Sequence, residues 1–270
     1  MSTTPTSEAG EGPQARGEAS AIISVGRALS ILDAFMGDDH LLPLSELARR
    51  VGLPKSTAFR LVAQLTESGF LTRVGRNYRL SSHVFELGNS VDASPVGFLR
   101  DVAAPHMAAL FQHVGFGVNL AVLDSTSIVY LDRIRGPRSP NLLSRIGARV
   151  PALTTALGKV MLAHSSRELI IQALNEGWPR STPYTVMRPE LMVGQLRQAR
   201  EAGVAYDREE AMLGLTCVAA PIFDPEGRPV GAISASGSTG RFRPESAADL
   251  TQRAARLISS DLKRTISLRA

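Results

Sequence analysis

The chain has 270 residues, a formal net charge of +5 and 44% hydrophobic residues, which is enough apolar material for two folded domains. It contains no run of about 18 apolar residues, so a helix that spans a membrane is excluded. The first twenty residues have neither a basic start nor an apolar segment, and the single cysteine, Cys217, cannot form an internal disulfide. We therefore expect a cytoplasmic protein.

The N-terminal region begins with a polar segment and continues with a helix. Residues 1–20 are rich in Ser, Thr, Gly, Pro and Glu, which predicts a disordered tail. In Ser24–Phe35 the apolar residues Val25, Leu29, Leu32 and either Ala28 or Phe35 recur at helical spacing. This segment is predicted to form an amphipathic helix.

Residues 45–68 have the pattern of two helices joined by a short glycine-containing turn. Ser45 is a suitable N-cap for a first helix over Glu46–Val51, and Gly52 tolerates the positive φ of a sharp turn. Pro54 is expected at the first position of the second helix. The pattern predicts a helix-turn-helix, in which the second helix enters the major groove of DNA.

Projection of the second helix at about 100° per residue separates an apolar from a polar face. Ala58, Leu61, Val62 and Leu65 form the predicted buried stripe. Arg60, on the polar face, can donate two hydrogen bonds to O6 and N7 of guanine, while serine and threonine hydroxyls can bind bases or phosphates. The candidate DNA contacts on this helix are Lys55, Ser56, Thr57, Arg60 and Gln64.

A short basic hairpin is predicted directly after this helix. Leu71–Val74 and Tyr78–Leu80 have the composition of strands, and Gly75-Arg76-Asn77 has that of a tight turn. A hairpin in this position is the wing of a winged helix. Arg76 and Asn77 are therefore further candidate contacts with phosphates or a minor groove.

Basic residues are concentrated in this region of the chain. Between Arg49 and Arg79 there are seven basic residues and one acidic residue, a local net charge of +6. Such an excess is expected of a surface that meets phosphates, although on charge alone an ordinary solvated face would explain it. A protein-interaction module whose winged helix binds another protein is one alternative.

A linker and a second domain are predicted for the rest of the chain. Ser82–Val91 is amphipathic and predicts a linker helix, which Ala93-Ser94-Pro95 is expected to end. The predicted domains are a tail (1–20), a winged helix-turn-helix (21–81), a linker helix (82–95) and a second domain (96–270).

The second domain alternates predicted helices with predicted hairpins. The helices are expected at 97–114, 154–164, 168–175, 189–201 and 244–268. The strands are expected at 117–123, 128–134, 217–224 and 229–236. This order predicts an α+β fold, with an antiparallel sheet flanked by helices.

Enzymatic and metal-binding motifs find no match. Gly158-Lys159 resembles part of a P-loop, but Leu153 and Val160 stand where that motif requires Gly and Ser or Thr. No two of the five histidines have metal-ligand spacing beside carboxylates or cysteine. Cys217 lies in an apolar strand, where cysteine usually acts as a small hydrophobe. We expect no catalytic residue, metal or cofactor; an enzyme that uses Cys217 on a bound acid remains the other alternative.

Four segments together resemble the IclR family of bacterial transcriptional regulators. They are PKSTAFRLVAQLTESGFL (54–71), RIGARVPALTTALGKVMLA (145–163), GVAYDREEAMLGLTCVAAPIFD (203–224) and AISASG (232–237). The resemblance runs from about Ser24 to the C-terminus. It implies a winged helix-turn-helix that binds operator DNA, followed by a GAF-like domain that binds a small effector and assembles homodimers or homotetramers.

The resemblance also implies where an effector binds. The family's pocket positions fall on Ala156, Leu157, Asp207, Leu215, Cys217, Ser234 and Ser236. A helix N-terminus and two serines on one strand face suit a small organic acid. Asp207 departs from a simple anion site because an ionised carboxylate prefers a hydroxyl or a water donor.

Overall fold

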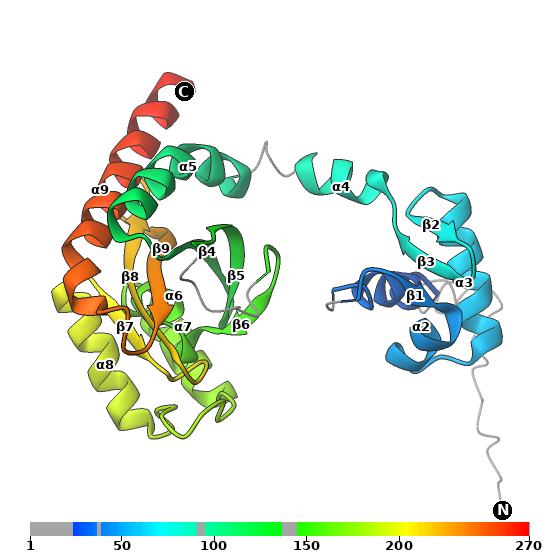
Figure 1. The fold of residues 1–270 in the computed structure, drawn as a ribbon, viewed down its shortest axis with the longest axis horizontal. Coiled ribbons are helices and arrows are strands. Elements are labelled where there is room, and N and C mark those ends of the chain that lie inside the picture. Colours follow the sequence, from blue (N-terminus) through cyan, green and yellow to red (C-terminus); the bar gives the residue numbers. More distant parts are fainter. Residues whose placement is uncertain (1–23, 37–38, 91–94, 137–144, 270) are drawn as a thin grey trace, which may run out of the picture. The chain divides into compact units, whose positions relative to one another are not determined.

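The computed structural model describes residues 24–36, 39–90, 95–136 and 145–269. The chain divides into two compact units, Met1–Ser90 and Val91–Ala270 (Figure 1). The predicted tail (1–20) and Ala93-Ser94 at the predicted boundary lie outside the described residues. None of the helices in the described ranges is long and apolar enough to cross a membrane.

The first unit consists of helices around a small sheet. Residues 24–33 are helical. They are followed by β1 (Leu42–Pro43), α2 (Leu44–Arg50), α3 (Lys55–Glu67), β2 (Leu71–Val74), β3 (Asn77–Leu80) and α4 (Ser82–Asn89). The strands form an antiparallel sheet in the order β1-β3-β2. Helices α2 and α3 with the β2–β3 hairpin match the predicted winged helix-turn-helix.

The start of α2 differs from its prediction. The helix begins at Leu44 with Pro43 as its N-cap, and Ser45 lies inside it, so Ser45 is not the cap. The reason is the unpredicted strand β1: Pro43 pairs with Asn77 and is still extended, so the helix begins immediately after it. Pro54 likewise precedes α3 as its N-cap instead of opening it.

The core of the first unit confirms the predicted buried face of α3 and part of the predicted apolar face of the first helix. Ala58, Leu61, Val62 and Leu65 of α3 are buried, as predicted from their spacing. In the first helix, however, Val25 and Leu29 are 60% and 55% exposed, and the buried residue is Ile31, which was not predicted. Phe35, just after the helix, is buried as predicted, and it packs with Ile31 in the core that includes residues of α2 and α3.

The second unit is built on one six-stranded sheet. Its elements are α5 (Pro95–Val114), β4 (Gly117–Asp124), β5 (Ser127–Ile134), β6 (Arg149–Pro151), the 3-10 helix η2 (Ala152–Thr154), α6 (Ala156–Ala163), α7 (Arg167–Glu176), α8 (Pro189–Ala202), β7 (Ala205–Arg208), β8 (Leu215–Phe223), β9 (Pro229–Ser238) and α9 (Pro244–Arg269). The strand order is β6-β5-β4-β9-β8-β7, and every described pair is antiparallel. The predicted α+β class is confirmed.

Helices cover both faces of this sheet (Figure 1). Helices α5 and α9 pack on one face against the larger apolar cluster, which includes Val218 and Ile233. Helices α6 and α8 belong to a second cluster on the other face, which includes Ala219 and Ala232. Because side chains alternate along a strand, consecutive residues of β8 and β9 serve opposite clusters. The edge strands β6 and β7 were not predicted.

Candidate functional site

Helix α3 carries the predicted DNA contacts at the surface. Lys55, Ser56, Arg60 and Gln64 are exposed, and Thr57 is half-buried. The buried stripe on the other side fixes the helix to the core of the first unit. The N-terminal turn of the helix, where winged-helix proteins meet base edges, is therefore free to approach DNA.

The wing is a hairpin with a two-residue turn. Val74 pairs with Asn77, so the turn consists of Gly75 and Arg76, and Gly75 has a φ of +60°. Arg76 is exposed at this turn. Asn77 was predicted in the turn but is the first residue of β3, where it is half-buried and also pairs with Pro43.

In the second unit, the sheet register brings three of the predicted effector residues side by side. Asp207 of β7 pairs with Cys217 of β8, which pairs with Ser236 of β9. Ser234 lies two residues from Ser236 on the same strand face, and Leu215 lies two residues from Cys217. The Asp207 and Ser236 side chains are almost fully buried, so this row forms a polar strip inside the domain.

Asn119 joins this strip and was not predicted. Its Nδ2 atom donates hydrogen bonds to Ser234 Oγ at 3.3 Å and to Ser236 Oγ at 3.1 Å. Asn119 is the only amide in the apolar strand β4, and that isolated polar residue is a signal that the sequence offered. The two serine hydroxyls are thereby oriented by a fixed donor, and the Ser236 hydroxyl in turn donates to the Gly117 carbonyl at 3.3 Å.

The N-terminus of α6 is packed against the same face of the sheet. Ala156 and Leu157, in its first turn, are buried in the apolar cluster that includes the partly buried Cys217. Thr155 caps the helix by accepting a hydrogen bond from the Gly158 amide at 3.0 Å. The amides of a first helical turn have no partner within the helix, so they attract an anion. All seven predicted effector residues thus lie on α6, β7, β8 and β9.

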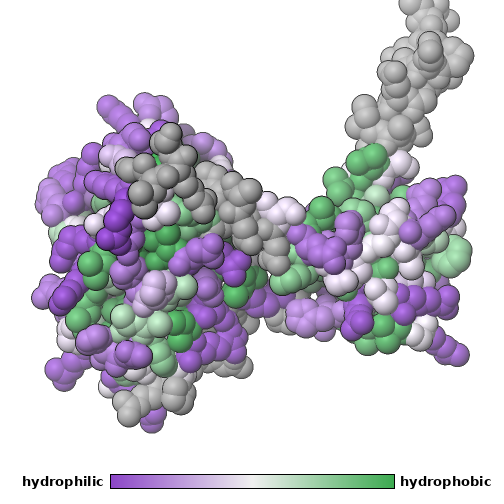
Figure 2. Space-filling view, turned by 90° about the horizontal axis from the view of Figure 1, so that it is seen from above, coloured by the Kyte–Doolittle hydropathy of each residue, from purple (hydrophilic) through white to green (hydrophobic). Residues whose placement is uncertain are grey.

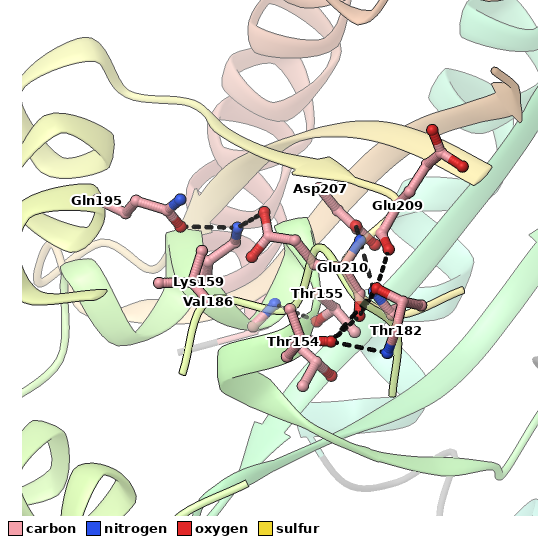
Figure 3. A network of polar contacts seen from close by, with 12 residues as sticks. Thr154, Thr155, Lys159, Thr182, Val186, Gln195, Asp207, Glu209 and Glu210 are labelled. Carbon is pink, nitrogen blue, oxygen red and sulfur yellow. Dashed lines mark hydrogen bonds and ion pairs between the residues drawn. The ribbon is translucent and has the colours of Figure 1, made fainter. Parts of the chain in front are cut away.

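A buried ion pair lies next to this strip (Figure 3). Lys159 Nζ donates to Glu210 Oε1 at 2.6 Å and to Gln195 Oε1 at 3.0 Å. The side chains of Lys159 and Glu210 are only 2% and 6% exposed. Glu210 Oε2 is buried with no hydrogen-bond partner among the described residues. The sequence indicates a buried charge here, because Lys159 is the one charged residue in the apolar helix α6. Its partner Glu210 is 51 residues away and could not be predicted.

Two threonines tie a neighbouring loop to the backbone of Glu209 and Glu210, and Figure 3 labels one of them, Thr182. Thr182 Oγ1 donates to the Glu209 carbonyl at 2.6 Å, and Thr185 Oγ1 donates to the Glu210 carbonyl at 2.8 Å. Both threonines are buried. The position of the loop between α7 and α8 therefore depends on the position of Glu210.

Burial raises the pKa values of ionisable side chains in the strip and beside it. It raises the pKa of Asp207 to about 7, against the opposing effects of the Lys159 charge and of the Glu210 and Ala211 amides that donate to Asp207 Oδ1. Burial also raises the pKa of the Cys217 thiol well above its ordinary value, with a further contribution from Asp207. The pKa of Tyr130 is raised for the same two reasons, burial first and then the charges of Cys217 and Asp207. A neutral thiol is a poor nucleophile, so the site does not support covalent chemistry at Cys217.

Replacing Asp207 with asparagine is expected to flatten the pH dependence of stability. The folded pKa of about 7 lies above the ordinary value of 3.8, so the folded state holds the proton more tightly than the unfolded state. The stability that this provides is full below the ordinary pKa and is lost as the pH rises through the folded pKa. Asparagine keeps the acceptor oxygen but cannot ionise, so the variant should lose this decline.

Urea unfolding at about pH 5 and about pH 8 measures the effect. Asp101→Asn, at an exposed position in α5, is the matched control and should lose as much unfolding free energy between the two pH values as the wild type does. If the unfolding free energy of Asp207→Asn falls between pH about 5 and about 8 as much as that of the wild type, the raised pKa of Asp207 is wrong.

Within the described ranges, no group of three or more His, Cys, Asp or Glu side chains could hold a metal ion. The polar strip consists of hydroxyl, amide, thiol and carboxyl groups, which are able to form hydrogen bonds.

Comparison with known proteins gives consistent matches over both units. Residues 24–75 match the model of the IclR helix-turn-helix domain, and residues 97–261 match that of the bacterial transcriptional regulator IclR C-terminal domain. The HTH-type transcriptional regulator XynR of Escherichia coli is 36% identical over 224 residues, which cover 82% of this chain and 88% of that protein. The transcriptional repressor IclR of Escherichia coli is 32% identical, over 81% of each chain.

A solved structure resembles the whole fold. The crystal structure of an IclR homologue from Microbacterium hydrocarbonoxydans, complexed with 4-hydroxybenzoate, matches with a TM-score of 0.81 and 30% identity. The match covers 88% of this chain and 98% of that chain.

Proposed function

Because this chain belongs to the IclR family of bacterial transcriptional regulators, we propose that a small organic acid in its second unit controls its affinity for operator DNA. The family provides a DNA-binding helix-turn-helix and a C-terminal effector-binding domain, and its members are not enzymes. The observation that carries the finer proposal is the buried polar strip under the first turn of α6.

The chemistry of the strip fits an acid that also carries an apolar body. The α6 amides and the Ser234 hydroxyl can donate to a carboxylate, while Leu157 and Leu215 provide apolar contacts. The Ser236 hydroxyl donates to the Gly117 carbonyl at 3.3 Å. Asp207 can donate its proton to the same ligand because its pKa lies near 7. The related protein complexed with 4-hydroxybenzoate supports this ligand class.

A homodimer is proposed from the surface of the first unit. Val25 and Leu29 are exposed on its first helix, and Figure 2 shows hydrophobic residues at the surface where that helix begins. Apolar residues that gather at a surface are typical of an interface between chains. Two recognition helices would then meet half-sites about 34 Å apart.

The effector would act by favouring one arrangement of the dimer over another. A tenfold change in operator affinity requires about 1.4 kcal/mol of differential binding. Helix α4 follows the wing directly in sequence and is the proposed element that transmits the change.

Replacing Arg60 with alanine is expected to weaken operator binding about 10- to 100-fold and to relax the preference for one guanine. The bidentate contact that arginine makes with O6 and N7 of guanine accounts for about 1–3 kcal/mol. The measurement is a fluorescence-anisotropy titration of a duplex that the wild-type protein selects from a random library. Arg253→Ala, at an exposed position in α9, should bind like the wild type. Unchanged affinity and preference in Arg60→Ala would rule out this contact.

A salt titration separates DNA recognition from binding to a protein partner. Phosphate contacts release counterions, so operator affinity should fall steeply, by roughly 0.9 in log K per log unit of salt for each contact. A flat profile would favour a protein-interaction module.

A thermal-shift screen of small organic acids tests the effector proposal. An acid at 100 times its Kd should stabilise the protein by about 2.7 kcal/mol. Ser234→Ala should lower the shift, because it removes a hydroxyl donor of the strip. If no acid shifts the unfolding temperature, the proposed ligand class is wrong.

A further inference from the structure

An exposed aromatic residue lies on the recognition helix among the candidate DNA contacts. The Phe59 side chain in α3 is 56% exposed, although phenylalanine normally helps to form a core. Its chain neighbours are the buried Ala58 and the exposed Arg60. Phe59 is therefore at the margin between the helix face that packs on the domain and the face that is free.

The surroundings of Phe59 place it where DNA would be read. Lys55, Ser56, Phe59 and Arg60 line one open depression with Leu44 of α2. Helical side chains lean toward the N-terminus, so the ring of Phe59 lies over the turn that contains Lys55 and Ser56. That turn is the part of a recognition helix that meets base edges.

The chemistry of these neighbours leaves one kind of base contact unfilled. Arg60 and Ser56 recognise bases by hydrogen bonds, and Lys55 is suited to a phosphate. In the major groove, the one apolar group that distinguishes a base is the C5-methyl group of thymine, and an apolar side chain recognises it by contact. A phenylalanine ring, which cannot hydrogen-bond, is suited to contact that methyl group.

We propose that Phe59 is a specificity-determining residue that contacts the C5-methyl group of a thymine, next to the guanine that Arg60 contacts. The inference rests on the proposed role of α3 as the recognition helix. In addition to hydrogen bonds, the helix would then recognise the operator through an apolar contact. The proposal predicts adjacent guanine and thymine in each half-site.

Deoxyuridine scanning tests this contact directly. The probe is the duplex that the full-length wild-type protein selects from a random library. Each thymine of one half-site is replaced in turn by deoxyuridine, which keeps the base pair and lacks only the methyl group. At one position the wild-type affinity should fall about fourfold, which corresponds to about 0.8 kcal/mol for one buried carbon. Phe59→Ala should bind the thymine duplex more weakly and should be indifferent to deoxyuridine at that position.

Two variants serve as controls. Tyr184→Ala removes an exposed aromatic ring of the second unit, 60% exposed, and should keep the wild-type deoxyuridine profile. Phe59→Leu retains an apolar side chain and should keep part of the sensitivity. Circular dichroism establishes that the variants are folded.

The outcomes separate this inference from the proposed function. If no duplex is selected, the proposed operator binding itself fails. If a duplex is selected but no thymine position responds to deoxyuridine, or Phe59→Ala responds as the wild type does, the Phe59 contact is wrong. The contact is established if the wild type is sensitive to deoxyuridine at one thymine position and Phe59→Ala is not.

Discussion

Lys159→Met is expected to destabilise the second unit by about 3–5 kcal/mol. Removing one partner of a buried ion pair leaves the other charge without compensation in an apolar interior. Here the remaining charge is Glu210, whose side chain is 6% exposed and whose Oε2 already lacks a hydrogen-bond partner among the described residues. Methionine has nearly the length of the lysine side chain, so the loss arises from the charge and not from a cavity.

The consequence extends beyond the pair itself. The Glu210 carbonyl accepts from Thr185, and its amide donates to Asp207 at 2.7 Å. If Glu210 moves toward solvent, the loop anchored by Thr185 and the carboxyl of the polar strip both lose a partner. Binding of an acid should therefore weaken together with stability in this variant.

Urea unfolding of the full chain, followed in the transition of the second unit, measures the change. Arg208→Met breaks an exposed ion pair with Glu245 and should cost at most about 1 kcal/mol. The double variant Lys159→Met/Glu210→Leu should recover much of the lost stability, because it removes both charges. A single variant as stable as the wild type would show that Glu210 is already compensated without Lys159.

Gly158→Ala is the second substitution with a large expected effect, a loss of about 3 kcal/mol. A Cβ atom at this position would lie 2.2 Å from the carbonyl oxygen and 2.3 Å from the Cα atom of Ala152. Both atoms belong to the backbone of η2, so a change of side-chain rotamer cannot relieve the overlap. Overpacking of this kind usually costs about 1–3 kcal/mol and more where the neighbour is rigid. Either η2 or the first turn of α6 must move.

Because Ala156 and Leu157 are in that turn, the variant should also bind an acid more weakly. Thermal unfolding and the acid screen measure the two effects. Gly194→Ala is the matched control: it lies inside helix α8 with no atom within 4 Å of the added Cβ. That substitution should leave stability unchanged or raise it by up to about 1 kcal/mol. Equal stability of the two alanine variants would mean that α6 does not require the close approach.

The parts of the structure that were predicted from sequence are those set by local patterns. The recognition helix shows its buried stripe in four residues at helical spacing, and the hairpins follow their turn residues. Ser45 was assigned wrongly as a cap because strand β1 pairs with β3, about 35 positions further along, and that pairing determines where α2 starts. Short edge strands such as β6 and β7 have too few residues to show an alternating pattern.

The candidate site divides in the same way. The predicted effector positions came from resemblance to a family, and the register of β7, β8 and β9 explains why they are neighbours. Asn119 and Glu210 were missed because their partners lie far away in sequence: Ser234 is 115 residues from Asn119, and Lys159 is 51 residues from Glu210. Sequence patterns identify an isolated polar residue in an apolar element, but they do not identify its partner.

The alternation of β9 has a consequence for how this protein can evolve. Ser234 and Ser236 face α6, while Ile233 and Ala235 pack in the cluster of α5 and α9. Mutations that change ligand preference can therefore accumulate on one side of the sheet while the packing that keeps the domain folded is inherited unchanged on the other. Substitutions at the proposed effector site can therefore alter ligand preference without disturbing the apolar cluster of α5 and α9.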